Sequence, residues 1–322
     1  MARLESGLYR IIRIRTPMII LIKHNQLDIE KWDHCIKKDT SGLFYGYSWY
    51  LDTLVKEWDA LVYNDYEAVF PLIKGKKFGF NYLFRPYGTQ QLGIFSHVNK
   101  TPELVHAFVE AIPATYRYVD VFLNTDNPVD LINARWLRRN VNYELSLNRA
   151  YKAIYDGYSK QTVRNLNKAK KHKHRIFEYD SPEQLVELFK ANKGKEVNTL
   201  TEANYSKILH IMHVMLHKRR GYLWTIYDDH NTIICGAFFV EMGGRIVLLF
   251  SAADKTAKQQ HAMTYLLDEL FIARAGDQII FDFEGSNIPG LARFYAGFGA
   301  IEKTYYNLHI NRLPAPIKWL KR

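Results

Sequence analysis

The chain has 322 residues, of which 48% are hydrophobic and 24% are charged. This balance is typical of a globular protein with a sizeable core, and it excludes a disordered or fibrous chain. The formal net charge of +11 favours an anionic partner such as a nucleic acid, a phosphate-rich ligand or a membrane surface.

In chain order, the first half is predicted to contain two helices, a hairpin, a third strand, a helix and two further strands. Periodicity and turn residues place them at 27–38, 48–58, 59–65, 66–73, 78–84, 101–112, 116–124 and 141–148. The length exceeds what one core usually serves, so two domains or one duplicated unit are expected.

The second half opens with two helices that carry clear start signals. Ser181, with Pro182 and Gln184, forms a capping box before one helix, and Thr201 is a cap for the next. A three-strand meander, a helix, a strand, a helix and a last strand follow at 222–229, 232–241, 245–252, 255–276, 278–285, 288–299 and 300–310. The two halves share this outline, which predicts duplication with domains at 1–150 and 151–322.

Two cysteines, Cys35 and Cys235, lie in segments predicted to be regular and lack metal-ligand spacing, so buried thiols of a reducing compartment are expected. The longest apolar run of the first 23 residues, MIILI, is too short for a signal peptide or a membrane span. We expect a soluble cytoplasmic protein without a transmembrane segment. The sequence sets no oligomeric state.

The positive charge is concentrated in one segment. Residues 1–150 hold 19 Lys and Arg against 16 Asp and Glu, which leaves +8 of the +11 for residues 151–322. From Ser159 a helix with a narrow apolar stripe is predicted, within a basic segment 159–175. Its cations form either an anion-binding or RNA-binding face or a solvated face that keeps the protein soluble. They are Lys160, Arg164, Lys168, Lys170 and Lys171.

Three histidines, His210, His213 and His217, share one face of a predicted helix. No Glu follows the first as a zinc protease requires, and no carboxylate lies at a useful offset on that face. The pattern predicts a polar helix flank and no metal site.

The stretch FDFEGSNIPGLARFYAGFGA, residues 281–300, contains the main candidate for chemistry. Asp282 and Glu284 alternate along a predicted strand, so they share a face and one of them should have a raised pKa. Such a carboxylate could orient or deprotonate an acceptor amine. It could equally bind backbone N–H groups at the start of the next helix.

The end of this stretch resembles the closing motif of the GNAT superfamily of N-acyltransferases, with Asn287 followed by RFYAGFG, including Tyr295. The same residues resemble the ending of the Fem family of tandem GNAT-fold enzymes, and YSKQTVRNLNKAKKHKHRI resembles that family's basic segment. The resemblance implies α/β architecture with tandem GNAT-like domains, each a mixed, mostly antiparallel sheet flanked by helices. It also implies transfer of an acyl or aminoacyl group to an amino group, with Tyr295 as proton donor. A packed core role for Tyr295 is the alternative.

The resemblance has two departures. Tyr295 stands where the Fem ending has Lys, so a tRNA contact of that Lys is not carried over. His261 and Met263 stand where the GNAT pyrophosphate loop has small residues, which disfavours ordinary coenzyme A binding. No cofactor is assigned, and the donor is expected to be either aminoacyl-tRNA, making tRNA a partner, or acyl-coenzyme A.

In the first half, the loop RPYGTQQLG follows a strand and is either a surface turn or one wall of an acceptor cleft between the halves. It supplies the substrate-binding candidates Arg85, Gln90 and Gln91, beside Asn287 from the motif. Two rival functions remain open: a coenzyme A-dependent N-acetyltransferase, and a non-catalytic RNA-binding protein on a GNAT scaffold.

Overall fold

A computed structural model describes residues 18–196, 200–285, 287–315 and 318. Within these residues all strands join one sheet in the order β1-β2-β3-β4-β6-β13-β7-β12-β11-β10-β9-β8, with β5 beside β3. Only β4 with β6 and β11 with β12 pair in parallel. The predicted fold class, α/β with a mixed and mostly antiparallel sheet flanked by helices, is confirmed.

The first half contains the predicted elements and two short strands that were not predicted, β1 and β5. Asp28 caps α1 by accepting from the N–H of Lys31, and Thr101 caps α3 with Pro102 in its first turn. The elements are β1 (Ile19–Lys23), α1 (Ile29–Lys38), α2 (Ser48–Leu54), β2 (Trp58–Tyr63), β3 (Ala68–Lys77), β4 (Phe80–Phe84), β5 (Phe95–Ser96), α3 (Pro102–Glu110), β6 (Tyr116–Phe122) and β7 (Leu137–Ser146).

The second half also follows the predicted order, with two short elements that were not predicted, α4 and β8. The predicted capping box at Ser181 is present, and Thr201, predicted as a cap, forms a capping box with Asn204. The elements are α4 (Tyr151–Tyr155), α5 (Lys160–Ala169), β8 (Arg175–Phe177), α6 (Pro182–Ala191), α7 (Glu202–His217), β9 (Gly221–Tyr227), β10 (Ile233–Met242), β11 (Arg245–Ala253), α8 (Lys255–Gln260), α9 (Ala262–Arg274), β12 (Ile280–Asp282), α10 (Pro289–Ala296) and β13 (Ile301–Asn311).

Several element boundaries differ from the prediction, and three of these differences bear on the candidate site residues. The helix expected at 255–276 is divided into α8 and α9, because His261 adopts a left-handed conformation with φ of 55°. The basic helix ends at Ala169, and β8 begins within the segment expected to continue it. The strand expected at 278–285 ends at Asp282, because Glu284 is also left-handed, with φ of 52°.

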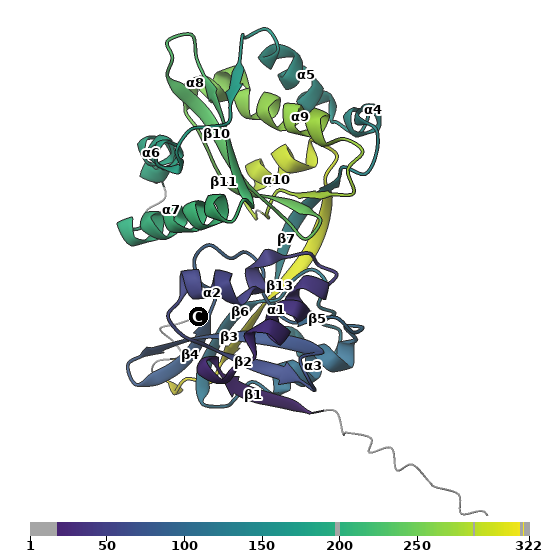
Figure 1. Ribbon diagram of the computed structural model, residues 1–322, viewed down its shortest axis with the longest axis vertical. Coiled ribbons are helices and arrows are strands. Elements are labelled where there is room, and N and C mark those ends of the chain that lie inside the picture. Colours follow the sequence, from purple (N-terminus) through teal and green to yellow (C-terminus); the bar gives the residue numbers. More distant parts are fainter. Residues whose placement is uncertain (1–17, 197–199, 286, 316–317, 319–322) are drawn as a thin grey trace, which may run out of the picture.

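The last strand of each half pairs with strands of the other half (Figure 1). Strand β7, from the first half, lies between β12 and β13 of the second half and is antiparallel to both. The long β13 pairs with β7 along its first residues and with β6 along its last residues. The two halves therefore share backbone hydrogen bonds. The domain boundary at 150 and the duplication stay predictions.

Buried side chains form three hydrophobic clusters. The first cluster joins residues of both halves, among them Trp32, Tyr45 and Met212. Cys35 and Cys235 are buried free thiols, as predicted, and burial raises the pKa of the Cys35 thiol to about 12. No helix in the described ranges is long and apolar enough to cross a membrane.

Gly299 explains part of the RFYAGFG pattern. Its φ is +76°, and a Cβ atom there would lie 2.8 Å from the carbonyl oxygen of Gly157. The N–H of Ser159, which caps α5, donates to the carbonyl of Gly297 at 2.8 Å. These close backbone contacts require small residues, and they fix the end of α10 against the start of the basic helix α5.

Candidate active site

A buried cluster of charges holds the carboxyl end of β12. Asp282, its last residue, lies opposite Glu144 of β7, and both are buried. Arg245, at the start of β11, places its Nη1 atom 2.8 Å from Glu144 Oε1 and 3.0 Å from Asp282 Oδ2. Asn142 Nδ2 donates to Asp282 Oδ1 at 3.0 Å, and Arg245 Nε donates to the carbonyl of Ser41. Buried charges persist only with such partners, so Asp282 is held as part of the framework.

Burial has the largest effect on the pKa values of Asp282 and Arg245, and the charges of their neighbours modify it. Burial raises the pKa of Asp282 to about 6, with Glu144 adding to the rise and Arg245 opposing it. Burial alone would lower the pKa of Arg245, but the carboxylates of Asp282 and Glu144 more than reverse that effect and raise it. The guanidinium therefore stays charged, and its two carboxylate partners are fixed around it.

Glu284 follows β12 in a strained turn. Its φ of 52° is uncommon for a residue with a side chain. Its N–H donates to Asp282 Oδ1 at 2.9 Å, which stabilises the turn. The next residue must be glycine, because a Cβ atom at Gly285 would lie 1.8 Å from the carbonyl oxygen of Val141. Because of this turn, Glu284 does not continue the side-chain alternation of β12. The prediction that Asp282 and Glu284 share one face of a strand is therefore wrong.

The side chain of Glu284 joins the two halves of the sequence. Its Oε1 atom accepts a hydrogen bond from the hydroxyl of Tyr45, in the turn Phe44–Gly46 of the first half. Burial raises the pKa of Glu284 to about 8, and the charge of Asp282 adds to the rise, while Tyr45 and Arg85 oppose it. A carboxyl group with a pKa near neutral pH is suited to proton transfer.

Glu284 faces a cavity of about 360 Å³ that residues of both halves line. Its walls come from the loop after β4 and from α7, β11, the turn after β12 and β13. The lining residues are Arg85, Pro86, Tyr87, Gly88, Thr89, Gln90, Ile208, Leu249, Phe250, Glu284, Gly285 and Tyr305. The structure thus brings together three residues that the sequence had singled out separately, Arg85, Gln90 and Glu284.

The loop 85–93 is held by hydrogen bonds of its own amides. Gln91 is buried, donates from Nε2 to Gln90 Oε1 at 2.9 Å and accepts from the N–H of Thr125 at 2.9 Å. Gln90 Nε2 in turn lies 3.4 Å from Asn142 Oδ1, which connects the loop to the cluster around Asp282. Gln91 therefore positions Gln90 and does not line the cavity.

Tyr305, which the sequence analysis did not single out, lines the cavity from β13. Burial raises its pKa to about 12, with Glu284 adding to the rise and Arg85 opposing it. Tyr295 is not among the lining residues. Its ring packs in the second hydrophobic cluster, 4.9 Å from the ring of Phe283 and 6.1 Å from that of Tyr143.

Asn287 connects the turn after β12 to β7. Its Oδ1 accepts from the N–H of Val141 at 3.3 Å, and its Nδ2 donates to Asn140 Oδ1 at 2.8 Å. Both polar atoms of its side chain are therefore occupied by β7. Its contribution to a substrate site would be through the position of this turn.

Four of the five predicted cations line a separate groove on α5. Lys160, Arg164, Lys168 and Lys171 border a space of about 570 Å³ together with Tyr158, Val163 and Asn167. Lys170 points elsewhere, with its Nζ atom 3.5 Å from Asp268 Oδ2. Because α5 buries Leu166 and Ala169, its cations are left on the outer surface.

The histidine face of α7 contains one ion pair, with His213 Nε2 2.6 Å from Glu183 Oε1 of α6. Burial lowers the pKa of His261, at the break between α8 and α9, and the charges of Lys168 and His172 lower it further. In the part of the chain that the structure describes, no three or more His, Cys, Asp or Glu side chains form a group that could hold a metal ion.

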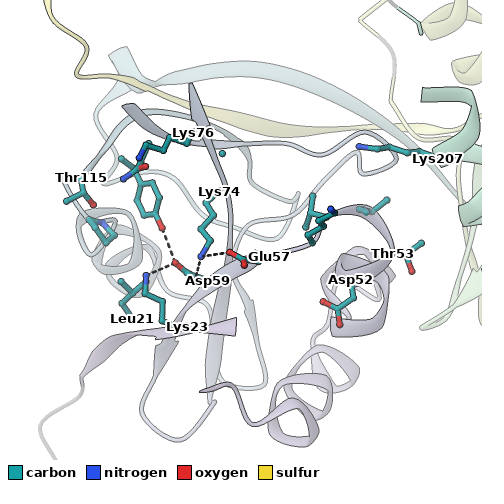
Figure 2. A pocket seen from close by; sticks show the side chains of 17 residues that line it. Leu21, Lys23, Asp52, Thr53, Glu57, Asp59, Lys74, Lys76, Thr115 and Lys207 are labelled. Carbon is teal, nitrogen blue, oxygen red and sulfur yellow. Dashed lines mark hydrogen bonds and ion pairs between the residues drawn. The ribbon is translucent and has the colours of Figure 1, made fainter. Parts of the chain in front are cut away.

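A larger cavity of about 960 Å³ lies beside the sheet of the first half, around the fully buried carboxylate of Asp59 (Figure 2). Lys23 Nζ and Lys74 Nζ each lie 2.9 Å from an oxygen of Asp59, and Tyr116 donates to it at 3.2 Å. Burial would raise the pKa of Asp59, but the two ammonium groups lower it overall. None of the predicted site residues lines this cavity, and the Asp59 carboxylate is already paired with Lys23 and Lys74, so we place the candidate site at Glu284.

The chain resembles solved structures over most of its length. FemX superposes with a TM-score of 0.68 at 11% sequence identity, covering 94% of this chain and 99% of that one. The C-terminal domain of a putative lysylphosphatidylglycerol synthetase from Agrobacterium fabrum has a TM-score of 0.55 at 11% identity, covering 91% and 93%. For L-PGS from Bacillus licheniformis the TM-score is 0.51 at 12% identity, covering 91% and 94%.

At these identities the likeness establishes the fold, and the Fem-like fold predicted from the sequence is confirmed. No protein-family model and no curated protein matches this chain.

The raised pKa of Glu284 predicts a pH dependence of stability. Between the ordinary value of 4.5 and about 8, the unfolded carboxyl is ionised while the folded one keeps its proton, so its contribution to stability is lost as pH rises. We expect the free energy of unfolding of wild type, relative to Glu284→Gln, to fall between about pH 5 and pH 8 and then level off. Denaturant titration at several pH values measures this difference. A difference independent of pH would contradict the assignment.

Proposed function

We propose that this protein is an acyltransferase that moves an acyl or aminoacyl group onto an amino group bound beside Glu284. The observation that supports this most strongly is the carboxyl group of Glu284. It has a raised pKa, lies in a strained turn and faces a cavity that residues of both halves line. Strained backbone and perturbed pKa values gather at functional sites. The Fem-like fold agrees with this chemistry.

Glu284 is proposed as the general base. An acceptor amine is bound as an ammonium ion and must lose a proton before its nitrogen can attack a carbonyl carbon. The ammonium charge would itself favour the ionised form of Glu284. Tyr45, which donates to Oε1, orients the carboxylate and leaves its second oxygen to face the substrate.

The transfer forms a C–N bond and breaks the C–O bond of an ester donor or the C–S bond of a thioester donor. The ammonium loses two protons in all. One reaches solvent through Glu284, and the other restores the proton that a phenol has given to the leaving oxygen or sulfur. We assign that delivery to Tyr305, because it lines the cavity, whereas Tyr295 packs in the core. Arg85 lies at the same cavity, where its positive charge would attract an anionic substrate.

Aminoacyl-tRNA is the donor that the surface favours. The groove on α5 has four cations and a polar amide, which suits a phosphate backbone. The coenzyme A alternative is weakened by the left-handed break at His261, where a bulky side chain stands at the start of α9. The non-catalytic RNA-binding alternative uses the same groove and differs only in having no need of Glu284.

The catalytic proposal predicts a rate that rises with pH through an apparent pKa near 8, because only ionised Glu284 can accept a proton. Glu284→Gln should lower kcat by roughly 100-fold or more. The matched control is Glu302→Gln, at an exposed position near the start of β13, which should keep the wild-type rate. Transfer of radiolabelled acyl groups from aminoacyl-tRNA and from acyl-coenzyme A to a panel of amines measures both. Equal rates for the two variants would refute the role of Glu284.

The donor proposal predicts salt-sensitive tRNA binding through α5. The double variant Lys168→Glu, Lys171→Glu should weaken tRNA binding at low salt and reduce the slope of log affinity against log salt by about two. The same double change at Lys37 and Lys38 of α1 is the control and should have little effect. Filter binding at two or more salt concentrations measures both. Tight acyl-coenzyme A binding without tRNA binding would favour the coenzyme A alternative, and full activity without tRNA contact by α5 would contradict the proposal.

A further inference from the structure

A second cavity adjoins the candidate active site through Arg85, which lines both. It has a volume of about 390 Å³ and is formed by β4, β6, β7 and β13, where the two halves share strands. Its lining residues are Phe84, Arg85, Asp120, Phe122, Arg138, Asn140 and Asn307. Of these residues, only Arg85 was predicted from the sequence as a site residue.

The strand register places these side chains on one face of the sheet. Asn307 of β13 lies opposite Phe122 of β6 on one side and opposite Arg138 of β7 on the other. Because side chains alternate along a strand, Asp120 shares the face of Phe122, and Asn140 shares the face of Arg138. The cavity is therefore built on regular strands, which hold its polar groups in fixed positions.

The charges of this cavity are unbalanced. Asp120 is its one carboxylate, and Asn307 Nδ2 donates to Asp120 Oδ1 at 2.6 Å. The guanidinium of Arg85 lies over the ring of Phe122, 4.2 Å from its centre. Among the described residues, neither Arg85 nor Arg138 has an acidic partner within salt-bridge distance, whereas the neighbouring Arg139 is paired with Glu302. Two unpaired guanidinium groups at one cavity attract an anion, which they can bind through paired N–H donors.

A polar stripe connects this cavity with the catalytic carboxylate. Arg138, Asn140, Asn142 and Glu144 alternate along one face of β7. Asn142 contacts both Gln90, which lines the first cavity, and Asp282, which holds the turn of Glu284. Asn142 is itself fully buried, so a ligand that spans the two cavities would pass Arg85, which lines both.

We propose that the second cavity binds an anionic group, a carboxylate or a phosphate, of the acceptor molecule, while the amine of that molecule lies beside Glu284 in the first cavity. This inference rests on the proposed function and specifies its acceptor as an amine that carries a negative charge. Arg138 and Arg85 bind the anion, and the amides of Asn140 and Asn307 supply further hydrogen bonds. Arg138 determines specificity and takes no part in proton transfer.

The test compares Arg138→Leu with Arg139→Leu, a matched control one residue away on the opposite face of the same strand. The probes are n-butylamine, 4-aminobutyrate and O-phosphoethanolamine, with binding measured by NMR titration at low salt. Wild type should bind the anionic amines more tightly than n-butylamine, and Arg138→Leu should weaken that binding by roughly tenfold. Arg139→Leu should leave the binding of the anionic amines unchanged. Asp120→Asn should strengthen this binding, because it removes a negative charge from the cavity. Arg138→Lys should restore part of the loss.

The two anionic probes distinguish the source of the charge: stronger loss with 4-aminobutyrate assigns a carboxylate, and stronger loss with O-phosphoethanolamine assigns a phosphate. Equal binding of all three amines, or equal effects of the Arg138 and Arg139 variants, would overturn the inference. Glu284→Gln separates it from the proposed function, because this variant should lose transfer and keep the Arg138-dependent binding. Transfer that prefers n-butylamine and ignores Arg138 would leave the function standing and refute the anion site.

Discussion

The ion-pair cluster around Arg245 is the interaction on which the rest of the site depends. One guanidinium holds Asp282 at the end of β12, Glu144 on β7 and the carbonyl of Ser41. These groups belong to both halves of the sequence, so breaking the cluster would leave buried charges without partners, at a cost of about 3–5 kcal/mol. Because Asp282 is fixed, its Oδ1 atom can accept from the N–H of Glu284 and stabilise the left-handed turn there.

This arrangement separates the roles of two carboxylates that lie two residues apart. Asp282 remains next to a cation, whereas Glu284 faces a cavity and, among the described residues, has a neutral phenol as the direct hydrogen-bond partner of its side chain. Burial and the charge of Asp282 both favour the protonated form of Glu284, so its pKa rises further, to about 8. Paired carboxylates with different environments are a common way to set acid and base roles in one site. Strands β7 and β13, which each pair with the other half, complete the site. They place Asn142 and Tyr305 beside the turn that contains Glu284.

Much of the fold could be predicted from local signals, because caps and periodicity act over a few residues. Ser181 and Thr201 marked the starts of α6 and α7 correctly. The alternation that grouped Asp282 with Glu284 failed at Glu284, because side-chain alternation assumes extended backbone and the left-handed turn breaks it. Contacts such as Tyr45 with Glu284, 239 residues apart, and the pairing of β7 with β12 depend on tertiary packing that no local pattern encodes. The catalytic roles of Asp282, Glu284 and Tyr295 stay predictions.

The central claim is that Glu284 keeps its proton near neutral pH and can therefore exchange one with an amine. The most direct measurement is a carbon-13 NMR titration of the glutamate carboxyl groups, with the Glu284→Gln variant used to assign the signal. The structure predicts one glutamate carboxyl that titrates with a pKa near 8 and whose signal is missing from the variant. If the signal assigned to Glu284 titrates near its ordinary value of 4.5, the account of this site is wrong.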